Sequence, residues 1–155
     1  MTAQPANVRV RDAEVGDEAA WRSLWRDFVV GGPEPCAEGA ADYVWRNVQD
    51  SGSPMRLLLA EAGNRAPAGF LLYVTHPYSW SPRLACYLLD LYVVPAARGR
   101  RIGQTLIEIL AERGRQDGWY KIYWMTQSDN APAQALYDRL AERSALVRYD
   151  LMLNP

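Results

Sequence analysis

One stretch of the chain, residues 93–106 (VVPAARGRRIGQTL), constrains the fold most. It ends a run of β-branched and aromatic residues typical of a strand, and Pro95 terminates that strand because proline cannot donate to a ladder. A glycine-containing turn with three arginines follows. Apolar residues then recur at the spacing of one buried helix face: Ile102, Leu106, Ile109 and Leu110. The stretch predicts a strand, a basic turn and a helix in direct succession.

The basic turn predicts an anion at the start of this helix. The free N–H groups of a helix N-terminus carry partial positive charge, so acidic side chains are favoured there. Arg98, Arg100 and Arg101 are locally unfavourable unless an anion lies among them. Gly99 and Gly103 allow a backbone or a ligand to approach closely. The pattern indicates a phosphate or pyrophosphate site, with a plain basic surface turn as the alternative.

Two common phosphate loops do not fit this turn. A Walker A loop requires GxxxxGK followed by Ser or Thr, and Lys121 is the single lysine of the chain. A dinucleotide fingerprint requires GxGxxG, whereas Gly99 and Gly103 are four residues apart. The turn instead resembles the acyl-CoA pyrophosphate loop of the GNAT superfamily of N-acyltransferases, R/Q-x-x-G-x-G/A. Arg98 and Gly103 match its ends, and Arg101 stands at its middle glycine.

A second stretch, residues 124–137 (WMTQSDNAPAQALY), resembles the second motif of the same superfamily. That motif is a strand, a loop and then N-x-x-A-x-x-L/F-Y on the next helix, which Asn130, Ala133, Leu136 and Tyr137 match in spacing. A plain N-cap at Asn130 and a half-buried helix aromatic at Tyr137 are the alternatives. The resemblance covers the order of elements over residues 8–153 and is strongest over residues 69–137.

Residues 78–93 resemble the branch of the superfamily that acetylates polyamines, thialysine and related small amines. That branch has an aromatic loop, matched here by Tyr78 and Trp80, and then L-E-D-L/F-Y/F-V. Its aspartate is kept as Asp90, and Leu89 replaces its glutamate, a proposed water-linked base in relatives. Strand alternation predicts that Leu89 and Asp90 face opposite sides of the sheet.

The resemblance implies acetyl-CoA (CoA) as the cofactor and direct transfer in a ternary complex, without a covalent enzyme intermediate. The backbone of Leu91, Tyr92 and Val93 would pair with the pantetheine arm. Asn130 and Ala133 would lie along the cofactor. Tyr137 would also contact the cofactor and protonate the leaving thiolate, since a phenol is neutral at pH 7. Backbone amides of the basic turn and helix start would hold the pyrophosphate: Arg98, Gly99, Arg100, Arg101, Ile102, Gly103, Gln104 and Thr105.

The acceptor of the acetyl group is expected to be an amine. An alkylamine is mostly protonated at pH 7 and must lose a proton before it attacks the thioester. Asp90 is the candidate base, acting through a water, and a structural partner for an arginine is its alternative. Glu34 and Glu38 follow the first predicted helix, where they would draw a cationic amine or be solvated. Tyr78 and Trp80 are expected to line a closed acceptor pocket.

The remaining candidate groups carry weaker functional signals. His76 is available as a base, but a single histidine in a loop is more often a surface residue. Cys36 and Cys86 have no motif spacing and are expected to be free thiols in a reducing cytosol. One histidine and no Cys/His cluster argue against a metal site.

Length and pattern predict a single N-acetyltransferase domain over residues 1–155. The expected class is α/β (α+β), a mixed, mostly antiparallel sheet with helices on both faces, in the order β-α-α-β-β-β-α-β-α-β. A right-handed crossover over residues 87–126 makes two strands parallel. Expected strands cover residues 8–11, 55–61, 68–75, 84–94, 121–126 and 145–153, and residues 76–82 form a loop. Expected helices begin at residues 16–17, 38, 102 and 131, and Asp17 caps the first of them.

Charge and hydropathy exclude other classes. The net charge of −1 provides no general basic field for nucleic acid. No run of about 18 apolar residues predicts a membrane span, and residues 1–10 have no apolar signal core. A cytoplasmic protein is therefore expected. The apolar last strand, residues 145–153, is an edge that would need cover, which makes a homodimer the expected assembly.

Three functions fit these observations. The first is acetyl-CoA-dependent acetylation of a primary amine on a small molecule that is polyamine-, amino-acid- or aromatic-amine-like. The second is a non-catalytic acyl-CoA-binding regulatory module, favoured by Leu89 and Arg101. The third is a protein N-terminal or lysine acetyltransferase, which would need an acceptor groove open at both ends.

Overall fold

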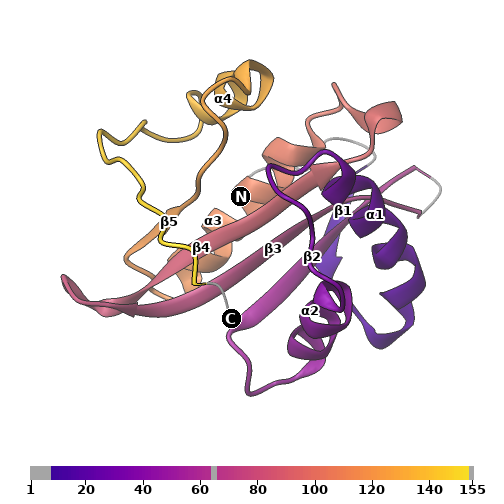
Figure 1. The fold of residues 1–155 in the computed structure, drawn as a ribbon, viewed down its shortest axis with the longest axis horizontal. Helices are drawn as coiled ribbons and strands as arrows, with labels where there is room; N and C mark the ends of the chain where they lie inside the picture. The colour runs from indigo at the N-terminus through magenta and orange to yellow at the C-terminus, as the bar shows by residue number, and fades with distance from the viewer. Residues whose placement is uncertain (1–7, 64–65, 154–155) are drawn as a thin grey trace. The chain divides into compact units, whose positions relative to one another are not determined.

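The computed structural model describes residues 8–63 and 66–153 (Figure 1). The chain divides into two compact units, residues 1–125 and 126–155. The first unit contains the β-sheet and three α-helices, and the second contains one short helix, α4 (Ala131–Tyr137).

The sheet of the first unit contains five strands in the order β1-β2-β3-β4-β5. Neighbouring strands are antiparallel except β4 and β5, which are parallel. The predicted mixed, mostly antiparallel sheet and its single parallel crossover are therefore confirmed. The strand bounds are β1 Val8–Asp12, β2 Met55–Ala62, β3 Pro67–Tyr78, β4 Ser81–Val93 and β5 Lys121–Tyr123.

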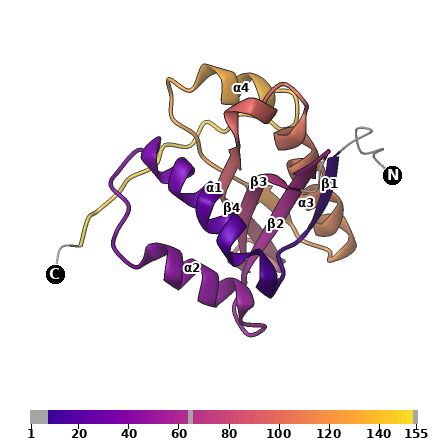
Figure 2. The ribbon, with the colours of Figure 1, turned by 90° about the vertical axis from the view of Figure 1, so that its right-hand side faces the viewer.

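Helices α1 (Glu18–Val30) and α2 (Ala40–Gln49) cover one face of this sheet, and α3 (Ile102–Gln116) covers the other (Figure 2). Trp21 of α1 is fully buried, and its ring centre lies 5.4 Å from that of Trp45 of α2. Trp21, Trp25 and Trp45 thus pack in the core, as burial statistics favour. The buried cluster on the α1–α2 face comprises Trp21, Leu24, Trp25, Val44, Trp45, Leu57, Leu59, Phe70 and Leu72.

The helix predicted after the basic turn is confirmed as α3. Its predicted apolar positions Ile102, Leu106 and Leu110 are buried. At the start of α1, a short 3₁₀ turn (Val15–Asp17) leads in, and Asp17 holds the cap position. Its carboxylate does not cap α1, because it accepts instead from Arg11 at 2.6 Å and from the amide of Glu14 at 2.7 Å.

The loop predicted over residues 76–82 is wrong, because β3 and β4 extend into it. Tyr78 pairs with Ser81, which leaves only Ser79 and Trp80 in the turn. The Tyr78 ring stacks on that of Tyr120, 5.3 Å away. This stacking on the residue before β5 (Lys121–Tyr123) stabilises a longer hairpin than the Pro- and Ser-rich sequence suggests.

A β-bulge in β4 overturns the predicted alternation of Leu89 and Asp90. Leu72 pairs with Asp90, but Tyr73 pairs with Leu88, so Leu89 is an extra residue on β4. Leu89 packs against the α1–α2 cluster, and Asp90 lies opposite Leu72 of that cluster. An extra residue shifts the alternation by one position. Both residues therefore belong to the α1–α2 face.

The predicted last strand over residues 145–153 is also wrong. These residues form no strand in the structure, and the preceding helix, α4, ends at Tyr137. Alternating apolar residues favour a strand, but a strand also needs a hydrogen-bonded neighbour, and none of the described strands pairs with this segment. Large apolar side chains there are exposed, including Leu146, Tyr149 and Leu151.

No helix in the described part of the chain is long and apolar enough to cross a bilayer. Nor do residues 8–63 and 66–153 bring three His, Cys, Asp or Glu side chains together as a metal site would require.

Gly69 of β3 is expected to be essential for the close approach of β4. A Cβ atom at this position would lie 2.6 Å from the carbonyl oxygen of Tyr92, a backbone atom that cannot move aside alone. Overpacking of this kind destabilises by about 2 kcal/mol, so Gly69→Ala should lower Tm by about 6 °C. Gly16→Ala is the control, because a Cβ there meets nothing within 4 Å. Equal Tm values for the two variants, by thermal denaturation, would contradict the expectation.

Candidate functional site

The turn between β4 and α3 has an unusual backbone. A short 3₁₀ turn (Pro95–Ala97) leads into it, and Gly99 and Arg101 have φ angles of 78° and 61°. Among the described residues, Arg101 is the single non-glycine residue in the left-handed region. This conformation costs a side-chain-bearing residue about 1–2 kcal/mol. Arg101 therefore adopts a backbone that glycine would adopt freely, and the loop makes its turn despite the substitution at this position.

The first amides of α3 are available to a ligand. No side chain caps this helix, and its first turn has no acidic residue. The amide and the hydroxyl of Thr105 both donate to the carbonyl oxygen of Arg101, at 2.9 Å each. The N–H groups of Ile102, Gly103 and Gln104 precede the first intrahelical bond and have no partner within the helix. Thr105 is buried and uses its own donors inside the helix.

The arginines of the turn differ in how they are held. Arg98 donates from Nε to the carbonyl oxygen of Val93 at 3.1 Å, which ties the turn to the end of β4. Arg101 reaches Gln104 at 3.4 Å, and Gln104 in turn donates to Glu108. Arg100 is exposed and makes no ion pair or hydrogen bond with the described residues. Free amides and cations together form a site for an anion.

Strand β4 has an unpaired edge beside this turn. β5 pairs with β4 only at Ala85, Cys86 and Tyr87, and β4 continues to Val93. Among the strands described, β3 is thus the one neighbour of the residues 88–93 segment. Leu91, Tyr92 and Val93, the residues predicted to meet the pantetheine arm, lie on this segment. A free strand edge can pair with an extended chain that carries amides.

Asp90 is a half-buried carboxyl group without a partner among the described residues. Burial raises its pKa from 3.8 to about 6, because a charged carboxylate is disfavoured away from water. None of the ion pairs or hydrogen bonds found over residues 8–63 and 66–153 involves it, so an arginine partner is not its role there. Asp90 can therefore take up a proton near neutral pH, as a base must.

A polar aromatic group lies on the same face of the sheet. His76 of β3 and Tyr123 of β5 are hydrogen-bonded at 2.8 Å, and the ring of Tyr123 stacks on that of Tyr87, 5.0 Å away. Lys121 lies 4.4 Å from the Tyr78 ring centre and donates to its hydroxyl. His76 is consequently part of the sheet and not of a surface loop.

The predicted acceptor residues do not come together with Asp90. Tyr78 and Trp80 lie at the tip of the β3–β4 hairpin, and Trp80 is 85% exposed. Asp90 lies about 30 Å along β4 from Ser81 beside them, at about 3.3 Å per residue. They therefore do not line one closed pocket with it. Glu34 and Glu38 are exposed in the segment between α1 and α2.

The second unit holds the other predicted residues. Asn130 is the N-cap of α4, and its side chain accepts from the amide of Ala133 at 3.3 Å. Tyr137 ends this helix, and burial raises the pKa of its phenol, which therefore keeps its proton at neutral pH. Cys86 of the first unit is buried, and desolvation raises the pKa of its thiol to about 12. Cys86 is therefore a poor nucleophile.

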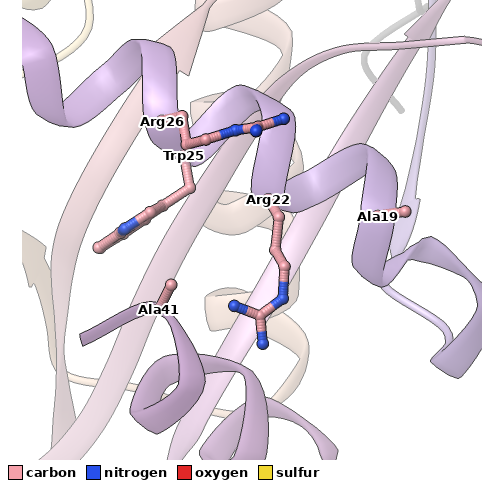
Figure 3. A pocket seen from close by; sticks show the side chains of 5 residues that line it. All are labelled: Ala19, Arg22, Trp25, Arg26 and Ala41. Atoms are coloured by element: carbon pink, nitrogen blue, oxygen red, sulfur yellow. The ribbon is translucent and has the colours of Figure 1, made fainter. Parts of the chain in front are cut away.

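A hollow of about 310 Å³ lies elsewhere, between α1 and α2 (Figure 3). Its walls are Ala19, Arg22, Trp25, Arg26 and Ala41. Arg22 pairs there with Glu18 and Asp42, at 2.8 Å and 2.7 Å. No residue of the basic turn or of β4 lines it, so the hollow is not the predicted cofactor site.

Sequence reasoning missed His76 and Tyr123 as a pair. The error was the assignment of residues 76–82 to a loop, because it excluded His76 from the period-2 pattern of β3. Continued alternation along β3 places His76 on the face of Leu72 and Val74. That alternation was the signal that could have found the pair.

Comparisons with known proteins agree with this arrangement. The model of the acetyltransferase (GNAT) family matches residues 18–141. A relative from Saccharomyces cerevisiae, the D-amino-acid N-acetyltransferase HPA3, is 31% identical over 145 residues, which cover 90% of this chain and 88% of the relative.

Two solved structures share the fold. A ribosomal-protein-alanine N-acetyltransferase from Brucella melitensis biovar Abortus 2308 has a TM-score of 0.79 at 19% identity, covering 95% of this chain and 99% of that one. The structure of AAC(6')-Iy in complex with a bisubstrate analogue, CoA-S-monomethyl-acetylneamine, has a TM-score of 0.77 at 19% identity, covering 96% and 100%. The family match spans most of the chain, and the sheet, the crossover and the basic helix start agree with it: the chain belongs to the GNAT family and is an N-acetyltransferase.

Proposed function

We propose that this enzyme transfers the acetyl group of acetyl-CoA to the primary amine of a small molecule. The transfer is direct and takes place in a ternary complex of enzyme, acetyl-CoA and acceptor. The observation that carries the proposal is the course of β4, whose unpaired edge leads from Asp90 to the basic start of α3. An amide-bearing arm can lie along that edge while a pyrophosphate meets arginines and helix amides. One continuous strand thus connects a candidate base to an anion site.

The donor groups of the first unit fit acetyl-CoA. The N–H groups of Ile102, Gly103 and Gln104, with Arg98, Gly99, Arg100 and Arg101 before them, would hold its pyrophosphate. Leu91, Tyr92 and Val93 would pair with its pantetheine arm. For Asn130 and Ala133, the family resemblance alone supports a role in cofactor binding. Acetyl-CoA supplies the acetyl group as a thioester.

Asp90 and Tyr137 would handle the two protons of the reaction. With a pKa of about 6, Asp90 is mostly ionised at pH 7, so it attracts the ammonium form of the acceptor and accepts a proton from its nitrogen through a water. Tyr137 keeps its phenol proton at this pH and donates it to the departing thiolate. Two groups with different proton affinities then act as base and acid.

An amino acid is the acceptor class that we favour. The relative named above acts on D-amino acids, as its name states, and it aligns with nine-tenths of this chain. The residues that resembled the polyamine branch, Tyr78 and Trp80, lie at a hairpin tip away from Asp90. Polyamines and aromatic amines are therefore secondary acceptors in this proposal.

The geometry favours turnover over a purely acyl-CoA-binding module. Leu89 and Arg101 were the residues that favoured such a module. Arg101 nevertheless adopts the left-handed backbone, and the extra residue Leu89 puts Asp90 on the α1–α2 face. Cytoplasmic location and a homodimer stay predictions.

Thiol release from acetyl-CoA tests the function directly. The wild-type enzyme is expected to release CoA with D- and L-amino acids faster than with polyamines, arylamines or a peptide N-terminus. Tyr137→Phe should lower kcat by about 100-fold while acetyl-CoA still binds, because general acid catalysis contributes about this much. Tyr43→Phe, at an exposed tyrosine of α2, is the control. Binding of acetyl-CoA without turnover of any acceptor would instead support the regulatory module.

Arg100→Gln is expected to weaken acetyl-CoA binding about tenfold, measured by calorimetry. A charge-assisted hydrogen bond contributes about 1.5–3 kcal/mol, and 1.4 kcal/mol corresponds to about tenfold in Kd. Arg115→Gln removes the same charge from the other end of α3 and should leave Kd unchanged. A Kd that does not distinguish the two variants would remove the basic turn from the site.

Asp90→Asn should abolish activity but raise thermal stability at pH 7.5. The folded-state pKa of about 6 exceeds the ordinary 3.8, so the folded chain binds this proton more tightly than the unfolded chain. The ionised carboxylate thus destabilises the fold as pH rises from 4 to 6. The Tm advantage of Asp90→Asn should vanish near pH 4. Asp27→Asn, at an exposed position of α1, is the control and should show no Tm advantage. A lower Tm than wild type at pH 7.5 would contradict the burial argument.

A further inference from the structure

His76 and Tyr123 form a hydroxyl–imidazole pair whose orientation is fixed from both sides. His76 Nε2 lies 2.8 Å from the Tyr123 hydroxyl, and His76 Nδ1 lies 2.7 Å from the carbonyl oxygen of Pro77. The two rings meet edge to face at 88°. Tyr123 is held in turn by its stack on Tyr87.

The carbonyl of Pro77 determines the tautomer of the imidazole. A carbonyl oxygen can only accept a hydrogen bond, so Nδ1 must carry a proton. In the neutral ring Nε2 is then the acceptor, and the Tyr123 hydroxyl donates to it. The Tyr123 oxygen keeps its lone pairs and can accept an N–H donor from a ligand. A hydroxyl on an imidazole oriented by a third group is how histidine takes up a proton in many enzymes.

The pair lies on the face of the sheet that carries Asp90. Tyr123 pairs with Tyr87 of β4, and Tyr87 lies opposite Val74 of β3. Leu72, two residues before Val74, lies opposite Asp90. Only Leu88 and the extra residue Leu89 lie between Tyr87 and Asp90 on β4, and the β3 partners of Tyr87 and Asp90 are two residues apart, so the separation is about 7 Å. Ile122 points the other way, since its Cδ1 would lie 3.5 Å from a Cβ at Gly114 of α3.

From this geometry we infer that Tyr123 and His76 accept the proton that the acceptor ammonium loses before attack, whereas Asp90 accepts the proton that the same nitrogen loses after attack. An N–H bond of the ammonium breaks, and its proton passes to the Tyr123 oxygen. The Tyr123 O–H bond breaks at the same time, and that proton passes to His76 Nε2. A neutral amine, a neutral tyrosine and an imidazolium result, and the imidazolium loses its proton to water after transfer. The inference rests on the proposed function.

The chain has one histidine, so its imidazole can be observed directly by ¹⁵N NMR. The pair requires His76 to be protonated at Nδ1 in its neutral form, with the Nε2 resonance shifted in Tyr123→Phe. Tyr120→Phe removes the hydroxyl of a nearby tyrosine, whose ring stacks on that of Tyr78. This control should leave the Nε2 resonance unchanged. A neutral ring protonated at Nε2 overturns the inference without any assay of turnover.

Kinetics distinguish proton uptake from support of the fold. An amine must be deprotonated before attack, whereas its aminooxy analogue is unprotonated at pH 7. Tyr123→Phe and His76→Gln should each lower kcat about 100-fold for the amine and leave kcat for the aminooxy analogue within about twofold. Gln keeps a hydrogen-bond acceptor for Tyr123 but cannot take a proton, so its activity should not exceed that of His76→Ala.

The outcomes separate this inference from the proposed function. If the two variants slow both acceptors equally, or if His76→Gln restores activity, the pair is structural and the inference is overturned. If the wild-type enzyme turns over neither acceptor and no amino acid, the proposed function itself fails. Tyr120→Phe should retain kcat for both acceptors.

Discussion

The hydrogen bonding of β4 changes along its length, and the rest of the site depends on that change. Near Ala85 the strand is paired on both sides, which fixes it in the sheet. Towards Val93 its one neighbour among the described strands is β3, so one row of backbone N–H and C=O groups is left for a ligand that carries amides. Because α3 begins a few residues later, the same strand leads from the open edge to the free amides of a helix N-terminus. Paired backbone provides rigidity, and unpaired backbone provides the binding edge.

The charges of the first unit follow the same division. Cations gather at the helix start, where Arg98, Arg100 and Arg101 would face an anion. The sheet face under α1 and α2 instead carries an ionisable carboxyl group, that of Asp90. Burial raises the pKa of this group towards neutral pH. The bulge at Leu89 brings Asp90 to that face. A phosphate-bearing donor and a cationic acceptor are thus favoured at different places along one strand.

Local sequence patterns predicted the parts of this structure that short-range physics determines. Pro95, the arginines and the apolar spacing of α3 predicted the turn and the helix. Register is different, because an extra residue such as Leu89 appears only when β3 and β4 are paired. The hairpin extension that brings His76 to Tyr123 depends on the same pairing. Residues 145–153 have an apolar pattern typical of a strand, but they pair with none of the described strands and therefore form none. The roles of Asn130 and Tyr137 rest on the family resemblance and on the chemistry of their side chains.

The central claim is that acetyl-CoA binds along β4 and at the start of α3. The most direct measurement is a titration of the ¹⁵N-labelled protein with acetyl-CoA, following backbone amide shifts. The account predicts the largest changes at Leu91, Tyr92 and Val93 and at the first amides of α3, residues 102–104. Changes confined to the hollow between α1 and α2, around Trp25 and Ala41, with the β4 amides unmoved, would contradict it.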